Sequence, residues 1–95
     1  MKVVIKPSKA KGKKYTAVFF NDSGKRVKTT NFGAKGYSDY TEHRDKERRE
    51  RYLKRHKNEN WNDYQSAGSL SRWILWGEGA LKTNISNYKK RFNLK

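Results

Sequence analysis

The sequence contains no cysteine, one proline and nine acidic residues. Without cysteine, the protein has neither a disulfide framework nor a thiolate metal site. No stretch approaches the roughly 18 apolar residues that a membrane-spanning helix needs, so we expect no membrane span. The short apolar run at the N-terminus is followed at once by basic residues, which is unlike a secretory signal. We therefore expect the protein not to be secreted.

Aliphatic residues are also scarce, since hydrophobic residues make up 33% of the chain and charged residues 35%. A chain of 95 residues can build one small core, and we expect residues 1–95 to form a single basic domain. Three Trp, six Tyr and four Phe compensate for the missing aliphatic side chains, because each ring buries a large area. The composition thus favours a folded domain with an aromatic core over a disordered chain.

Acidic residues are outnumbered by 24 Lys and Arg residues, which gives a net charge of +15. The excess is greatest in residues 1–36, with ten basic residues and one acidic residue; residues 37–60 contain eight and six. Such a surplus draws a protein to polyanions, and nucleic acid is the commonest of these partners. An anionic membrane or an acidic protein assembly is the less common alternative.

The residue pattern predicts an α+β domain in which a small antiparallel sheet packs against helices. Asn-Asp-Ser-Gly at residues 21–24 is typical of a hairpin turn, because Gly suits the left-handed position after a type I turn. β-branched and aromatic residues flank this turn, and helical spacing of apolar residues follows later in the chain. We expect three strands at about residues 2–6, 14–21 and 25–32, and three helices at about residues 40–57, 69–76 and 84–92.

The two strands of the hairpin present different faces. In the expected register, Phe19 lies opposite Val27 on one face, and Phe20 lies opposite Arg26 on the other. The second face mixes apolar and cationic side chains. It is either an edge face whose aromatic rings a helix covers, or a platform on which nucleic-acid bases stack.

The first predicted helix is rich in charges of both signs. Asp39 followed by Glu42 has the form of a capping box. Four acidic residues precede a basic residue by four positions, an order that stabilises a helix by ~0.2–0.5 kcal/mol per pair. The pairs are Glu42 with Lys46, Asp45 with Arg49, Glu47 with Arg51, and Glu50 with Lys54. They explain how a helix with few apolar residues forms, without any functional role.

Arginine residues share one face of the same helix. At 100° per residue, four of them fall within about 60° of one another, and we expect this ridge to point outward, opposite Leu53. Guanidinium groups bind phosphate or carboxylate oxygens in a bidentate manner, so the ridge predicts contact with an acidic partner. A merely solvated face is the alternative. The four residues are Arg44, Arg48, Arg51 and Arg55.

Further cations lie in a lysine-rich loop at residues 6–14 and on the return strand of the hairpin. We expect them to contact nucleic acid or an acidic partner together with the arginine ridge. With about six phosphate contacts, the logarithm of the affinity should fall against the logarithm of salt concentration with a slope near −5. These further candidates are Lys9, Lys11, Lys13, Lys14, Arg26 and Lys28.

Catalytic and metal-binding motifs are missing. His43 and His56 lie 13 positions apart on different helix faces and make a poor metal pair. The sequence has no Gly-x-Ser-x-Gly, phosphate-binding loop or His-Glu-x-x-His motif. We therefore expect no enzymatic activity, no cofactor, no metal and no small-molecule substrate. Trp73 and Trp76 are expected in the core, although one of them can remain partly exposed as an anchor for protein contact.

A further set of residues extends over most of the chain: Gly-Tyr-x-Asp-Tyr-Thr-x-His-x-Asp at 36–45, Tyr52, Arg55-His56, Trp61 and Leu75-Trp76. Over about residues 14–92, the sequence thereby resembles a family of short basic proteins of large DNA viruses (nucleocytoplasmic large DNA viruses) and phages. The resemblance implies a viral origin but no particular binding residues. Within this set, Tyr37 and Asp39 belong either to a binding loop or to the structural start of the helix.

The leading hypothesis is a non-enzymatic, virion-associated protein that binds nucleic acid through phosphate contacts without base specificity. We expect it in the virion or in the host-cell interior, in cytoplasm or nucleus. The rival is a minor capsid or cement protein. Its basic surface would bind neighbouring coat subunits, with Trp73 or Trp76 at the joint.

Overall fold

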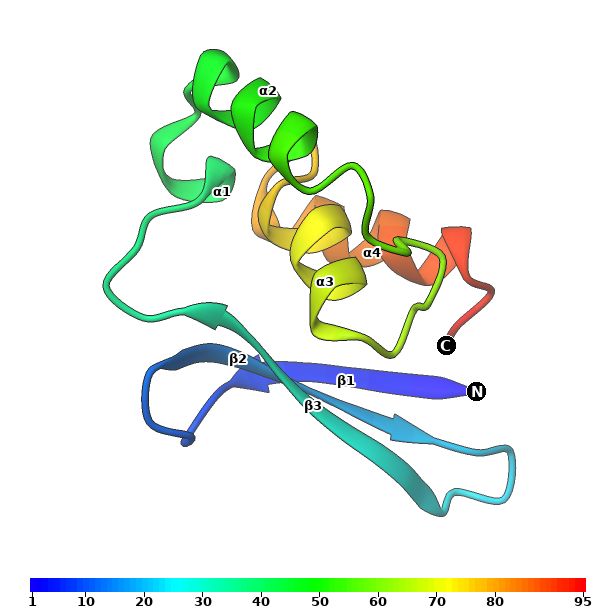
Figure 1. Ribbon diagram of the computed structural model, residues 1–95. Helices are drawn as coiled ribbons and strands as arrows, with labels where there is room; N and C mark the ends of the chain where they lie inside the picture. The colour runs from blue at the N-terminus through cyan, green and yellow to red at the C-terminus, as the bar shows by residue number, and fades with distance from the viewer.

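The computed structural model describes residues 1–95 and has the predicted α+β fold (Figure 1). One antiparallel sheet contains three strands in the order β1 (Lys2–Pro7), β2 (Lys13–Phe20) and β3 (Arg26–Ala34). The helices that follow are α1 (Tyr40–His43), α2 (Lys46–Arg55), α3 (Ala67–Leu70), the π-helical turn η1 (Ser71–Leu75) and α4 (Leu81–Arg91). All of them lie on one side of the sheet.

The core lies between the covered face of the sheet and the helices α3, η1 and α4. Phe19 and Phe32 are fully buried on the sheet, and Leu70, Ile74 and Tyr88 are buried on the helices. Burial of a large apolar side chain contributes about 1.5–3 kcal/mol, so a few rings and aliphatic groups hold the layers together. The aromatic core expected from the composition is therefore present.

The hairpin register agrees with the expectation at Phe20 and differs one position earlier. Phe20 pairs with Arg26, but a β-bulge between Phe19 and Phe20 places Lys28, not Val27, opposite Phe19. The bulge inserts an extra residue into β3, which alternation of side chains alone does not reveal. All helices lie on one side of the sheet (Figure 1), and Phe20 is not among the residues that pack against the core there. The expectation that a helix covers this ring is therefore wrong.

The lysine-rich loop is shorter than predicted. β1 continues through Pro7 and β2 begins at Lys13, so the connecting turn occupies residues 8–12 rather than 6–14. Pro7 pairs with Tyr15, and the Ser8 N–H donates to the Lys14 carbonyl at 3.0 Å. These backbone contacts extend the two-stranded ladder into the predicted loop.

The helix predicted over 40–57 is two helices, because the chain breaks at Arg44. Arg44 has a left-handed backbone with φ of 57° and closes α1. Asp45 then caps α2, and its side chain accepts hydrogen bonds from the N–H groups of Glu47 and Arg48 at 3.1 and 3.3 Å. The Asp45 N–H itself donates to His43 Nδ1 at 2.9 Å. Local side-chain bonds of this kind compete with a continuous helix.

The acid–base pairs expected along the helix are not formed. Glu42 binds Lys14 on the sheet, and Asp45 is used as a cap. Arg49 donates to the Trp76 carbonyl at 2.9 Å. The side chains of this segment therefore tie α1 and α2 to the rest of the fold, instead of bridging successive turns.

The two later helices begin slightly before their predicted positions. The α3–η1 segment runs from residue 67 to 75, and α4 begins at Leu81 rather than near residue 84. Asn84 is buried inside α4 and not at its start. Its amide donates to the Ile74 and Gly79 carbonyls at 2.7 and 2.8 Å, which fixes the turn between η1 and α4.

Candidate functional site

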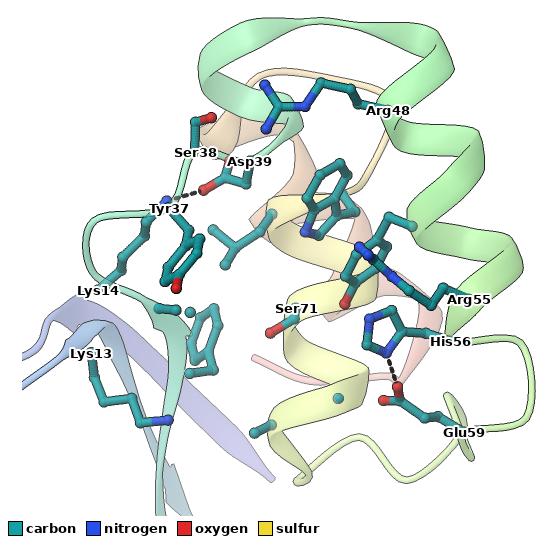
Figure 2. Close-up of a pocket in the computed structure, with 18 of the residues that line it drawn as sticks. Lys13, Lys14, Tyr37, Ser38, Asp39, Arg48, Arg55, His56, Glu59 and Ser71 are labelled. Carbon is teal, nitrogen blue, oxygen red and sulfur yellow. Dashed lines mark hydrogen bonds and ion pairs between the residues drawn. The ribbon is translucent and has the colours of Figure 1, made fainter.

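A cleft of about 830 Å³ separates α2 from the end of β3, with η1 along its base (Figure 2). Cationic side chains stand on both sides: Arg48, Arg51 and Arg55 on α2, and Lys13 on β2. The apolar part of the lining comes from Phe32, Tyr37, Tyr52, Leu75 and Trp76. The cleft thus combines basic walls with an aromatic and aliphatic base.

The three arginines of α2 have no acidic partner. Arg48, Arg51 and Arg55 are exposed, and none of them forms an ion pair with a carboxylate. Spacings of three and four residues place them on one face of α2. That face borders the cleft, whereas the sequence predicted a ridge pointing away from the molecule. Their charges remain available to an anion that enters the cleft.

A stack of rings fixes the rotation of α2. The Tyr52 ring lies 4.3 Å from the Trp76 ring at an interplanar angle of 5°, and His56 covers Tyr52 at 4.4 Å. Burial raises the pKa of the Tyr52 phenol to about 12, so it stays neutral at physiological pH. Because Tyr52 packs onto Trp76, the helix is rotated so that Arg48, Arg51 and Arg55 border the cleft.

The π-helical turn η1 supplies the base of the cleft. Its wider winding is visible where the Trp76 N–H donates to the Ser71 carbonyl, five residues earlier, at 3.0 Å. π-Helical turns are rare and often occur at functional sites. This turn places Ser71, Leu75 and Trp76 together on the cleft side.

Lys14 lines the cleft, but its charge is already neutralised. Its ammonium group donates to Asp39 at 2.7 Å and to Glu42 at 2.6 Å. Burial alone would lower the Lys14 pKa, but the hydrogen bonds and charges of the two carboxylates raise it above its ordinary value. Lys14 therefore links β2 to the start of α1, and its charge is not available to a partner.

Arg44 leaves the predicted ridge because the chain breaks there. Its guanidinium group donates to the Glu78 carbonyl at 3.4 Å and lies over the Tyr40 ring at 4.9 Å. It does not line the cleft. The ridge of four arginines becomes a wall of three.

The remaining predicted cations lie outside the cleft. Lys9 and Lys11 are exposed on the turn between β1 and β2, next to Lys13. Arg26 and Lys28 are exposed on β3. None of these four forms an ion pair, so they add to the positive field without contributing to the cleft lining.

Both tryptophans proposed as protein-contact anchors are half-buried. Trp76 packs on Tyr52 in the cleft. Trp73 donates its indole N–H to the Trp61 carbonyl at 3.0 Å, and the guanidinium groups of Arg72 and Arg91 lie over its ring. Their rings are therefore largely occupied by contacts within the chain.

Several cleft residues were not among the sequence-predicted contacts. Tyr37 is 74% exposed and borders the cleft beside Ser38. The Gly-Tyr-x-Asp motif indicated this loop. In the structure, Asp39 caps α1, whereas the Tyr37 side chain is exposed to solvent. His56 contacts Glu59 by a hydrogen bond at the opposite wall. No sequence pattern indicated Ser71, which reaches the site through the fold alone.

The arrangement is suited to noncovalent binding of an anion. No group of three or more His, Asp or Glu side chains is placed to hold a metal ion. No helix has the length and hydropathy to cross a bilayer. The cleft holds four unpaired cations beside an apolar base, and its two carboxylates, Asp39 and Glu59, are engaged with Lys14 and His56.

Comparison with known proteins identifies a family through a segment of the chain that includes part of the cleft lining. Neither the curated proteins nor the solved structures yielded a match. A family model matches residues 3–56, more than half of the chain, and this segment contains Lys13 and the three arginines of the cleft. The base formed by Ser71, Leu75 and Trp76 lies beyond it. The chain belongs to DUF5754, a family of unknown function.

Proposed function

We propose that this protein binds nucleic acid through phosphate contacts in the cleft, without base specificity and without catalysing a reaction. The observation that supports the proposal is the convergence of Lys13, Arg48, Arg51 and Arg55 on one cleft, with no carboxylate paired to any of them. Unpaired guanidinium groups are strong phosphate ligands because their planar forks donate two parallel hydrogen bonds.

The length of the arginine wall fits a short stretch of polynucleotide backbone. Arg48 and Arg55 are seven residues apart, which corresponds to about 10 Å along a helix. At one charge per roughly 3.4 Å on each strand, this length matches about three phosphates. Three arginines therefore face about three negative charges, while the apolar side chains below them can pack against sugars and bases.

The same geometry favours nucleic acid over a flat acidic protein surface. The cations line a concavity, and a broad coat-protein face would reach its rim but not its base. A polynucleotide can place a single residue inside it. Tyr37, which is 74% exposed at the edge, offers an aromatic face that stacks on any base regardless of sequence.

The test compares two triple variants with equal loss of charge. One replaces Arg48, Arg51 and Arg55 with Gln; the other replaces Lys46, Lys54 and Lys57, which are exposed nearby but do not line the cleft. Binding to fluorescent 12-nucleotide single strands and duplexes is followed by anisotropy at low salt. We expect the arginine variant to lose at least about tenfold in affinity, because each charge-assisted hydrogen bond is worth about 1.5–3 kcal/mol. The lysine variant should change far less. An equal loss in both, or no binding by the wild type, contradicts the proposal.

The biological setting is a second part of the proposal. The resemblance to short basic viral proteins favours a protein carried in the virion or acting in the host-cell interior, with the viral genome as its ligand. Nuclease treatment of opened particles tests this setting. Release of the protein together with the genome supports it, whereas retention on the emptied shell supports the minor capsid or cement alternative.

A further inference from the structure

A second group of arginines lies on the helical layer away from the cleft. Arg49 of α2, Arg72 of η1 and Arg91 of α4 line a smaller cavity of about 220 Å³. None of the residues that line this cavity also lines the cleft. The three residues come from three different helices, so the fold, and not local sequence, brings them together.

Of the three arginines, Arg72 is the one with a buried hydrogen-bond donor that lacks a partner. It is half-buried, and its guanidinium carbon lies 5.0 Å from the centre of the Trp61 ring and 4.2 Å from that of Trp73. It forms no ion pair, and its Nε atom is buried without a hydrogen-bond partner. Buried polar groups without a partner are rare, and an ion or water that completes the site is a common reason for them.

The charges around Arg72 are mostly of the same sign. Burial lowers the Arg72 pKa, and the neighbouring charges of Arg49 and Arg91 lower it further. Tyr52 and Glu78 act in the opposite direction but more weakly. Glu78 is 89% exposed and lies 4.0 Å from Arg49, so it screens the cluster poorly. Three guanidinium groups are thus held together with little compensation.

Stacking on Trp73 does not by itself occupy the N–H edges of Arg72 and Arg91. Arg72 and Arg91 both lie over the Trp73 ring, Arg91 at 3.8 Å from its centre. A cation–π contact uses the flat face of the guanidinium group, whereas oxygen atoms bind along its N–H edge. Arg49 donates its Nε–H to the Trp76 carbonyl, and its Nη2 lies 4.0 Å from the exposed Glu78 carboxylate, which is too long for a hydrogen bond.

We propose that Arg49, Arg72 and Arg91 form a second anion site that binds a phosphate group. Phosphate fits better than carboxylate because it offers more oxygen atoms and, as a monoester, nearly two negative charges to the three guanidinium groups that line one cavity. Asn87 adds an amide at the edge of the same cavity. The site does not depend on nucleic-acid binding in the cleft, since the two cavities share no residue.

The indole N–H of Trp73 is a direct probe of this site. Inorganic phosphate is titrated into the full-length protein at constant ionic strength, and the Trp73 indole signal is followed by ¹H–¹⁵N NMR. We expect a saturable shift that is lost in Arg91→Gln and in Arg72→Gln. Arg91 is exposed, so its variant keeps the test valid if Arg72→Gln does not fold. Arg26→Gln, which removes one exposed charge from β3, is the matched control and should keep the shift.

Two further ligands identify the source of the phosphate. Acetate at the same concentrations should leave the signal unchanged. A short oligothymidylate that shifts it at far lower concentration than inorganic phosphate assigns the site to a backbone diester, and a response to inorganic phosphate alone assigns it to a monoester. The proposal is overturned if phosphate gives no saturable shift, if acetate shifts the signal equally, or if Arg91→Gln responds like the wild type.

Discussion

The salt dependence of nucleic-acid binding provides a quantitative test of the cleft. The structure leaves four unpaired cations there: Lys13, Arg48, Arg51 and Arg55. For a single strand, each neutralised phosphate contributes about −0.7 to the slope of log affinity against log salt, so four contacts give about −2.8. This is shallower than the value near −5 expected from the sequence for two reasons. Four contacts replace about six, since Lys14 and Arg44 are engaged within the protein, and each phosphate of a single strand contributes about −0.7 rather than the roughly −0.9 of duplex DNA.

The change to be tested is the triple replacement of Arg48, Arg51 and Arg55 by Gln. One unpaired cleft cation then remains, and the slope should flatten to about −0.7. Between 50 and 200 mM salt, the wild type should lose about 50-fold in affinity for a 12-nucleotide strand, and the variant about threefold. Fluorescence anisotropy at four or five salt concentrations measures both slopes, and circular dichroism verifies that the variant is folded.

The lysine triple variant decides between a defined site and a diffuse charge effect. Replacement of Lys46, Lys54 and Lys57 removes the same total charge from exposed positions near the arginines. If the cleft binds the strand, this variant keeps a slope close to that of the wild type. Slopes that flatten equally in the two triple variants would refute the assignment, even if the wild type binds nucleic acid well.

Two other predictions concern stability. Gly33 and Gly36 both have positive φ, of 80° and 91°, but a Cβ on Gly33 would lie 2.9 Å from Leu75 Cδ1, whereas Gly36 is open. Gly36→Ala should cost the backbone strain alone, about 1–2 kcal/mol. Gly33→Ala should cost about 1–3 kcal/mol more through overpacking, seen as a lower melting temperature; equal losses would contradict the packing of η1 on β3. Lys14→Met should cost about 1–3 kcal/mol in urea unfolding near pH 7, because buried Asp39 loses its partner. Since the Lys14 pKa is raised in the folded state, this difference is full below pH 10 and should shrink as the pH rises above about 10.5. A difference independent of pH would show that the ammonium charge is not its cause.

The strands were largely predictable because their signals are local. The Asn-Asp-Ser-Gly turn fixes where β2 ends and β3 begins, and side-chain alternation separates the buried Phe19 from its neighbours. The bulge opposite Phe19 was not predictable, because one extra residue leaves the composition of β3 unchanged. The consequence is a Lys, not a Val, beside a core ring.

The sequence contains a signal for the break between α1 and α2, namely a second cap residue, but the acid–base spacings favour one continuous helix more strongly. Four favourable acid–base spacings predict a continuous helix over 40–57, and each is worth only a fraction of a kcal/mol. Asp39 and Asp45 are both good cap residues six positions apart, and each forms its cap in the structure. The break removes only the two pairs that span it, Glu42 with Lys46 and Asp45 with Arg49, which together are worth about 0.4–1 kcal/mol. The Asp45 cap, which a continuous helix would lack, is worth about 1 kcal/mol and offsets that loss.

The cleft itself had no local signature. Its lining comes from residues as distant as Lys13 and Trp76, and only the packing of α2 over η1 brings them together. The sequence identified Arg48, Arg51 and Arg55 as one face of a helix, which is a local property. It could not show that this face borders a concavity, because that depends on Tyr52 turning inward onto Trp76.

The position of Tyr52 also explains why one helix serves two groups of cations. With this ring fixed on Trp76, residues 48, 51 and 55 border the cleft, and residue 49 emerges on the side of Arg72 and Arg91. The acidic side chains near the two groups are mostly engaged elsewhere: Asp39 and Glu42 hold Lys14, and Glu59 contacts His56. Only Glu78 faces one of the arginines, at 4.0 Å from Arg49. The 24 basic residues thus include some that stabilise the fold, some that line the two cavities, and others that are exposed elsewhere on the surface. Like charges that lie close together in a cavity repel, and the phosphate binding proposed for both cavities would offset this cost.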